Sequence, residues 1–218
     1  YICKTFFKMK KTLFLIFSIF FIIISGNSNG SVAPTNTDRP TTGTLNGHDW
    51  VDLGLPSGTK WATCNVGANS PTAYGDYFAW GETFKKSEYG EGDYKYSDNP
   101  TILPASADAV TVNWGAGWRM PTLEEMNELY NKCTHKWTTQ NGVAGRLFIG
   151  PNGNSIFLPA AGSRSDSSLD KTGLSGCYWT SSFEPGDDSP WFLLFASDDY
   201  DVGHTNRYYG FSVRPVCN

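Results

Sequence analysis

The hydrophobic pattern is clearest in the middle of the chain, where it predicts an amphipathic helix. Thr122 and Glu125 have the spacing of a capping box, and Pro121 directly precedes them. The apolar residues that follow fall on one face at helical spacing: Leu123, Met126, Leu129 and Tyr130. The sequence therefore predicts a helix that begins after Thr122 and packs one stripe of side chains onto a core.

Strand patterns follow this helix. Two apolar runs surround Asn152-Gly153, which is a strong signal for a β-hairpin. Further strands are predicted at residues 177–181, 191–196 and 211–216. Because residues 211–216 alternate like a half-buried strand, Arg214 is expected to point outward and to pair with an acid. One or two helices followed by short antiparallel strands and long irregular loops indicate an α+β domain.

The segment before the last strand has the opposite character. Residues 197–209 read SDDYDVGHTNRYY and show no apolar periodicity. The contrast with residues 211–216 predicts a polar surface that is displayed by a rigid final strand.

Aromatic residues make up 15% of the chain, and tryptophan is frequent from residue 47 onward. Dense aromatic side chains usually dominate burial, so these rings are interpreted as core anchors rather than as ligand-binding surfaces. The tryptophans assigned to the core in this way are Trp61, Trp80, Trp114, Trp118 and Trp179.

The first 46 residues divide into two parts that precede the globular domain. Residues 1–30 comprise upstream residues, lysines around Met9, an apolar run at 12–24 and small residues after it. This layout predicts a secretory signal peptide cleaved between about residues 25 and 31, with an uncleaved N-terminal anchor as the alternative. Residues 31–46 are rich in Thr, Pro and Asn and are interpreted as a linker. The globular domain is expected at residues 47–218.

Net charge and histidine spacing disfavour several classes of function. The chain has 17 Lys and Arg residues and 21 Asp and Glu residues, and removal of residues 1–30 takes away four Lys, which leaves 13 − 21 = −8. An acidic surface disfavours nucleic acid and anionic membrane as partners. His48, His135 and His204 lie far apart without ligand spacing, so no metal site is predicted.

Four cysteines belong to the expected mature chain, namely Cys64, Cys133, Cys177 and Cys217. An even number of cysteines in an exported chain favours two disulfides, for which three connectivities exist. We favour Cys64 with Cys133 and Cys177 with Cys217. The second pair follows from the expectation that the strands at 177–181 and 211–216 share a sheet.

Six motifs together resemble a known family. They are HDWVDLGLPSGTKWATCNVGA, YGDYFAWGET, NWGAGWRMPTLEEMNELYNKC, NGNSIFLPAAG, YWTSS and GFSVRPV. Their order resembles that of the Fibrobacter succinogenes major paralogous domain and of related secreted domains in Bacteroides-type bacteria, and the resemblance covers nearly everything from Gly47 onward. It implies a C-type-lectin-like fold, in the variant shared with the formylglycine-generating enzyme, and a bacterial protein that is secreted or displayed at the cell surface.

The resemblance favours a non-enzymatic module that binds a glycan or a protein ligand, with no membrane span after signal cleavage. In such domains a stable sheet carries loops, and loops on a rigid scaffold are frequent recognition sites. Aromatic rings and forked donors bind well because they lose little entropy. The expected ligand-binding residues are Asp198, Asp199, Tyr200, Asp201, His204, Asn206, Arg207, Tyr208 and Tyr209. The acidic loop at residues 184–190 is expected at a neighbouring end of the same sheet.

Similar domains also serve as the variable proteins of diversity-generating retroelements. Residues 197–210 contain only residue types that mutated Asn codons can reach. The segment lies immediately before GFSVRPV, which is the place where such variation is expected, so it is a candidate for diversification.

Two other functions stay open. A structural or adhesive subunit of a surface assembly is compatible with the linker. A formylglycine-generating-enzyme-like oxidase would use Cys177 and Cys217, but the surrounding sequence does not match that enzyme and no other catalytic motif is present.

No cofactor is expected, with calcium as the alternative. Residues 184–188 read EPGDD, and Gly186 stands where calcium-dependent lectins carry an amide or an acid. The oxygen ligands that this loop offers are Glu184, Asp187 and Asp188.

Overall fold

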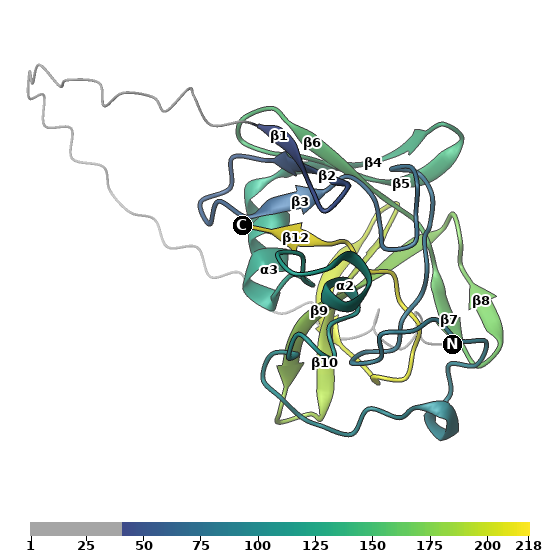
Figure 1. Ribbon diagram of the computed structural model, residues 1–218. Helices are drawn as coiled ribbons and strands as arrows, with labels where there is room; N and C mark the ends of the chain where they lie inside the picture. Colours follow the sequence, from purple (N-terminus) through teal and green to yellow (C-terminus); the bar gives the residue numbers. More distant parts are fainter. Residues whose placement is uncertain (1–40) are drawn as a thin grey trace, which may run out of the picture. The chain divides into compact units, whose positions relative to one another are not determined.

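The computed structural model describes residues 41–218, and these form a mainly β structure (Figure 1). Strand accounts for 40% and helix for 11%, arranged as several small antiparallel sheets with two α-helices. The predicted α+β class and the C-type-lectin-like fold are therefore wrong. The error has a simple origin, because three strands come before the α-helices and these helices have only 6 and 10 residues.

Three antiparallel sheets and a separate hairpin organise residues 41–218. The first sheet has the order β1-β2-β3-β12, with bounds Thr42–Leu45, His48–Asp52, Lys60–Ala62 and Val216–Cys217. The second is β4-β5-β6, with bounds Thr134–Gln140, Val143–Ile149 and Ser155–Pro159. The third is β11-β10-β9, with bounds Tyr200–His204, Ser189–Ala196 and Ser175–Glu184. The hairpin consists of β7 (Ser163–Ser165) and β8 (Ser168–Asp170).

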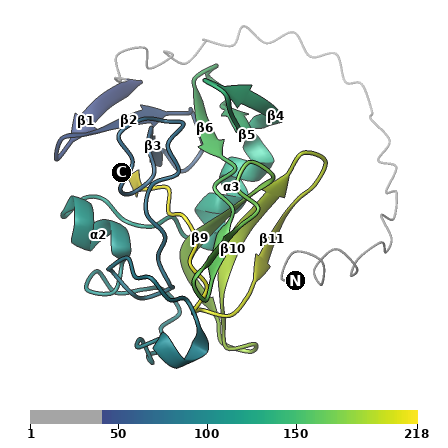
Figure 2. The ribbon, with the colours of Figure 1, turned by 90° about the vertical axis from the view of Figure 1, so that its right-hand side faces the viewer.

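The helices begin at side chains that accept hydrogen bonds from their first backbone N–H groups. The predicted capping box of α3 (Leu123–Lys132) is confirmed, because Thr122 Oγ1 accepts from Glu125 N at 3.3 Å and the Glu125 carboxylate accepts from Thr122 N at 2.9 Å. The shorter α2 (Ala109–Trp114) is capped in a similar way by Asp108. One turn of 3-10 helix, η1, spans Glu91–Asp93. α3 packs against β9, β10 and β4 (Figure 2).

Several predicted strands are confirmed. β5 and β6 form the hairpin around Asn152-Gly153, where Gly153 has a φ of 86° that favours glycine. β9 and β10 include the strands predicted at 177–181 and 191–196. The folded part begins before the expected boundary at residue 47, because β1 pairs with β2. The predicted signal peptide and most of the predicted linker fall in residues 1–40, which lie outside the described residues.

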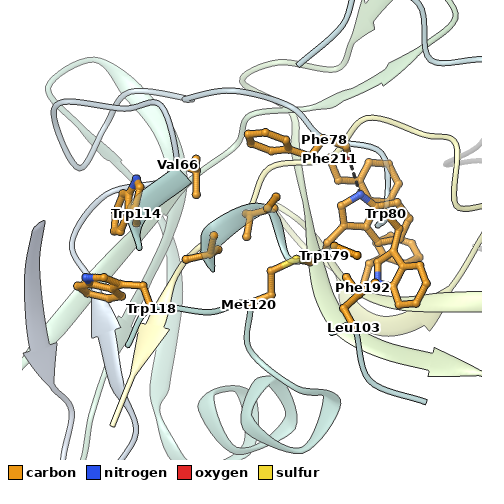
Figure 3. Packing of buried hydrophobic residues seen from close by; sticks show 14 of the residues in the cluster. Val66, Phe78, Trp80, Leu103, Trp114, Trp118, Met120, Trp179, Phe192 and Phe211 are labelled. Carbon is orange, nitrogen blue, oxygen red and sulfur yellow. Dashed lines mark hydrogen bonds between the residues drawn. The ribbon is translucent and has the colours of Figure 1, made fainter. Parts of the chain in front are cut away.

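Aromatic rings fill the largest core cluster (Figure 3). Trp179 stacks on Phe211 with ring centroids 4.2 Å apart, and its Nε1–H donates to Phe78 O at 2.8 Å. Trp80 donates to Thr180 O at 2.9 Å. Buried tryptophans need such partners for their N–H groups. The prediction of a tryptophan core is confirmed, since all five assigned residues are buried: Trp61, Trp80, Trp114, Trp118 and Trp179.

The strand predicted at residues 211–216 is wrong in extent, because only β12 at Val216–Cys217 is a strand and residues 211 and 212 form isolated bridges. The segment is also buried on all sides rather than half-buried. Phe211 bonds to Phe78, Ser212 N donates to Cys177 O at 3.1 Å, and Val216 belongs to β12. Every residue from 211 to 216 is buried, and Arg214 is 0% exposed. The prediction that Arg214 points outward and pairs with an acid is therefore wrong, because structure covers both sides of this segment.

The Arg214 guanidinium instead donates to four neutral oxygens. Its partners are Asn65 Oδ1 at 2.9 Å, Ala62 O at 3.0 Å, Thr63 O at 3.0 Å and Phe157 O at 2.9 Å. Burial lowers the pKa of Arg214 from its usual value because the charged form is desolvated. All of its contacts are charge-assisted hydrogen bonds, which are stronger than neutral ones.

Asn65 extends this contact into a buried network. Its Nδ2 donates to Tyr178 Oη at 3.2 Å, and the Tyr178 hydroxyl donates to Pro159 O at 2.7 Å. Ala62 lies on β3, Pro159 on β6 and Tyr178 on β9. The network therefore joins one strand from each of the three sheets.

The two favoured disulfides do not form. Cys64, Cys133 and Cys217 are reduced thiols, and burial raises the pKa of Cys133 to about 11. The expectation that these two strands share a sheet is wrong, because β12 pairs with β3 whereas β9 pairs with β10. Ser212 lies beside Cys177, but Cys217 comes five residues later and pairs with Lys60 on β3. Five extended residues cover about 16 Å, whereas a disulfide joins Cα atoms less than about 7 Å apart.

Replacement of Arg214 should destabilise the fold strongly. Arg214→Met leaves four buried oxygens without a donor, and Arg214→Lys replaces a planar fork by one ammonium that cannot reach them all. We expect each variant to lower the free energy of unfolding by about 3 to 5 kcal/mol in urea denaturation. The exposed Lys132→Met serves as the control and should change it by less than about 0.5 kcal/mol. Equal midpoints for Arg214→Lys and the parent protein would contradict this role.

Candidate ligand-binding surface

The predicted ligand-binding residues do not form one loop. Tyr200–His204 is strand β11, which pairs with β10 and lies along the outer edge of its sheet (Figure 2). Its five residues separate the two ends of the predicted segment by about 13 Å. Asp198, Asp199 and Tyr200 therefore lie at one end of the sheet. His204, Asn206, Arg207, Tyr208 and Tyr209 lie at the other, which is also the end of the turn between β9 and β10.

Tyr200 at the first end is an anchor. Its ring centroid lies 4.4 Å from that of Tyr130 and 4.6 Å from that of His135. The Arg146 guanidinium carbon lies 4.8 Å from the Tyr200 ring, and Arg146 Nη2 donates to Ala196 O at 2.6 Å. These contacts fix the start of β11 to the core, so Tyr200 contributes to stability rather than to a free surface.

Two aspartates cover the open edge of β11. Ala196 N donates to Asp199 O, and Thr205 N donates to Pro190 O, across β10 and β11. Because hydrogen-bonded and non-hydrogen-bonded pairs alternate in an antiparallel ladder, the backbone N–H groups of residues 200 and 202 face away from β10. Tyr200 N donates to Asp199 Oδ1 at 2.7 Å, and Val202 N donates to Asp201 Oδ1 at 2.8 Å. The carboxylates thus occupy the donors that another strand would need.

Arg207 anchors the second end. Its Nη2 forms a 2.6 Å ion pair with Asp188 Oδ1, and its Nη1 donates to Asp98 O at 3.2 Å. The guanidinium carbon also lies 4.7 Å from the Phe183 ring, and only 12% of the side chain is exposed. Trp80 N donates to the Arg207 carbonyl at 2.8 Å. Arg207 therefore ties the turn at 205–209 to the β9–β10 turn, to residue 98 and to the buried segment around Trp80.

Exposed and half-buried polar groups surround this anchor. His204 Nε2 lies 3.2 Å from Asp187 Oδ2, and the His204 ring meets the Trp191 ring edge-on at 5.0 Å. Asn206 is exposed, and its Nδ2 donates to Tyr208 Oη at 2.9 Å. Burial, followed by the neighbouring Tyr209, raises the pKa of Tyr208 to about 12, so its hydroxyl stays protonated at neutral pH.

The remaining predicted residues divide between surface and scaffold. Asp198 is exposed and accepts from Ser197 Oγ at 2.5 Å. Tyr209 stacks on Phe211 at 6.2 Å and packs against the aromatic core. Gly210 is buried so closely that an added Cβ would lie 2.6 Å from Tyr89. The segment proposed for diversification therefore includes positions that the fold constrains.

The three acidic side chains of the 184–188 loop do not gather around one point. Asp187 contacts His204, whereas Asp188 contacts Arg207 and accepts from Asn99 Nδ2 at 3.0 Å. Within residues 41–218 there is no group of three or more His, Cys, Asp or Glu residues arranged to hold a metal ion. The same residues contain no helix of the length and apolar character needed to cross a membrane.

Comparison with protein-family models, with curated proteins and with solved structures finds no match to this chain. The surface is therefore assessed from its own geometry. Sequence reasoning missed three contributors, namely Tyr94, Asp98 and Trp191. Tyr94 and Asp98 lie about one hundred positions before Arg207, and no local pattern in the sequence connects them.

Removal of the edge carboxylates should promote association. The double variant Asp199→Ala and Asp201→Ala frees two outward-facing amides on an edge strand, which is a common template for pairing between chains. We expect sedimentation velocity to show a concentration-dependent shift toward dimers or larger species. Asp198→Ala is the matched control, because its carboxylate bonds no backbone amide, and it should sediment as the parent protein does. A double variant that stays unchanged at high concentration would show that these carboxylates do not protect the edge.

Stability should fall below about pH 6.5. Burial, followed by the positive charge of Arg146, lowers the pKa of His135, and burial lowers the pKa of His48. The unfolded chain then binds more protons than the folded one as pH falls through the usual histidine pKa, so stability present above that pH is lost. We expect the melting temperature to fall between pH 7.5 and pH 5.5. The double variant His48→Gln and His135→Gln should show a smaller fall, and an equal fall would refute the assignment.

Proposed function

We propose that this chain is a non-enzymatic ligand-binding module, secreted or displayed at a bacterial cell surface. Its ligand is a glycan or a protein, and its binding surface is the end of the β9–β10–β11 sheet. The residues that contact the ligand are His204, Asn206 and Tyr208, together with Asp187 and Trp191. The observation that carries the proposal is the set of contacts of Arg207, which holds this group of exposed and half-buried side chains in place.

Preorganisation is the physical reason. Arg207 bonds to Asp188 and to Asp98 O while its backbone carbonyl accepts from Trp80, so three segments are held in one geometry. A surface that is rigid before binding loses less entropy when the ligand arrives. Side chains of Tyr, His and Trp then supply contact area and hydrogen bonds at low cost.

The alternative functions have less support. The oxidase would need Cys177 and Cys217 side by side, whereas Cys217 is a buried thiol that lies on β12 and pairs with Lys60. A structural or adhesive subunit could assemble through a sheet edge, but at the edge of β11 the amides of Tyr200 and Val202 are already bonded by Asp199 and Asp201. The proposal includes no nucleic-acid partner, since the chain is acidic overall.

The ligand-binding surface can be tested with two matched variants. The triple variant His204→Ala, Asn206→Ala and Tyr208→Ala removes three side chains of this surface but keeps Arg207, whereas Asp198→Ala removes an exposed carboxylate at the opposite end of the sheet. We expect the parent protein to bind defined members of a glycan array or an array of purified extracellular proteins. The triple variant should lose at least about tenfold in affinity for those members, because aromatic anchors dominate recognition.

Two controls complete this test. Asp198→Ala alone, at the opposite end of the sheet, should bind as the parent does, and all variants should melt within a few degrees of it. The proposal fails if the triple variant folds and binds with unchanged affinity. It also fails if Asp198→Ala weakens binding as much as the triple variant does.

A further inference from the structure

A cleft of about 440 Å³ lies among residues 81–107. Three segments of the chain line it. The first contributes Gly81, Glu82 and Phe84, the second contributes Tyr96, and the third contributes Ser106. The volume lies within the range of small-molecule sites in proteins. None of the residues proposed above to contact the ligand lines this cleft. The two sites are connected through Tyr94, whose ring contacts both Lys86 and Arg207.

Aromatic rings form the apolar part of the cleft. Tyr96 lies so close to Gly81 that an added Cβ would meet its ring at 2.1 Å. The Tyr96 residue is half-buried while its hydroxyl oxygen is buried, so the ring is the part that remains accessible. Phe84 is 77% exposed, the highest value among the large hydrophobic residues of the described chain that are exposed. An apolar ring so open to water gains free energy when a ligand covers it.

The walls of the cleft are held by an ion pair and a hydrogen bond, both made by Glu82. Glu82 Oε2 forms a 2.6 Å salt bridge with Lys86, and Glu82 Oε1 accepts from Lys95 N at 2.7 Å. Both side chains of the salt bridge are largely buried, with 13% of Glu82 and 21% of Lys86 exposed. The two sides of the cleft are therefore joined before any ligand binds.

Three polar groups at the cleft have no partner within residues 41–218. They are the Lys95 ammonium, the Asp93 carboxylate and the Ser106 hydroxyl, all on exposed residues. The other two lysines of the cleft are ion-paired, Lys86 with Glu82 and Lys85 with Asp76. Lys95 is therefore the cation that the cleft leaves available to an acidic ligand.

We propose that this cleft binds a sugar ring that carries a carboxylate. One face of a pyranose presents C–H groups that pack on aromatic rings, and Phe84 with Tyr96 provides such rings. Hydroxyl groups of the sugar can donate to Asp93 and bond with Ser106, and the acid group can pair with Lys95. An open cleft suits a ligand that keeps its other polar face in water. A wholly apolar ligand would leave these polar groups unpaired, at a cost in affinity.

The test compares an acidic sugar with its neutral counterpart. Isothermal titration calorimetry of the full chain at low salt uses trigalacturonate and a neutral galactose trisaccharide as probes. We expect saturable binding of trigalacturonate that is at least about tenfold tighter than that of the neutral sugar and that weakens with added salt, because exposed charges are screened. Phe84→Ala should weaken the binding of trigalacturonate at least about tenfold.

Lys95→Gln identifies the charge contribution. It should remove most of the preference for trigalacturonate while leaving the weak affinity for the neutral sugar unchanged. Lys136→Gln and Leu174→Ala are matched controls, because Lys136 is exposed on β4 and Leu174 is 67% exposed elsewhere, and neither should alter binding.

Three outcomes would overturn this proposal. They are no saturable binding of trigalacturonate, equal affinity for the neutral sugar, and equal losses in the controls. The result is independent of the surface at His204–Tyr208, because the triple variant at that surface should bind trigalacturonate as the parent does. Loss of binding in the triple variant alone would place the sugar at that surface and refute the cleft.

Discussion

The buried guanidinium of Arg214 is the constraint on which the arrangement of the sheets depends. Within residues 41–218 it has no carboxylate partner, and it donates to four neutral oxygens contributed by β3, the residues after it, and β6. Through Asn65 the same network reaches Tyr178 on β9. A buried charge is costly unless hydrogen bonds compensate it, so the sheets must hold these acceptors in one fixed arrangement. Three separate small sheets are thereby joined.

The same segment supports the surface proposed for binding. Phe211 bonds to Phe78 and stacks on Trp179, and Tyr209 stacks on Phe211. The turn at 205–209 therefore lies between buried residues, with Thr205 at its start and Gly210 directly after it. Its outward side chains can vary without loss of the core, whereas Arg207 and Tyr209 cannot. Recognition surfaces of this kind separate the residues that fix geometry from those that meet the ligand.

Local chemistry allowed part of this structure to be predicted. The capping box of Thr122 and Glu125, the turn at Asn152-Gly153 and the dense tryptophans each act through neighbouring atoms or through burial, and each was predicted correctly. The fold class was not, because a family resemblance and the order of the clearest motifs outweighed the weak signals of β1 to β3. The prediction for Arg214 was wrong because an alternation of polar and apolar residues shows only that the two faces of a segment differ. It does not show that the polar face is exposed to water.

Tyr200–His204 was missed as a strand because an edge strand needs little apolar character. The partners of Arg207 lie about a hundred residues away, and such contacts leave no local pattern.

Native-state hydrogen exchange, resolved by residue, tests the central claim that one buried network makes the three sheets a single cooperative unit. The slowest amides of β3, β6 and β9 should then exchange through the same opening reaction, with equal free energies and an equal dependence on denaturant. The edge amides near β11 and the turn at 185–188 should exchange faster through local opening. An opening of the β4-β5-β6 sheet at a distinctly lower free energy than the β9-β10-β11 sheet would contradict the account.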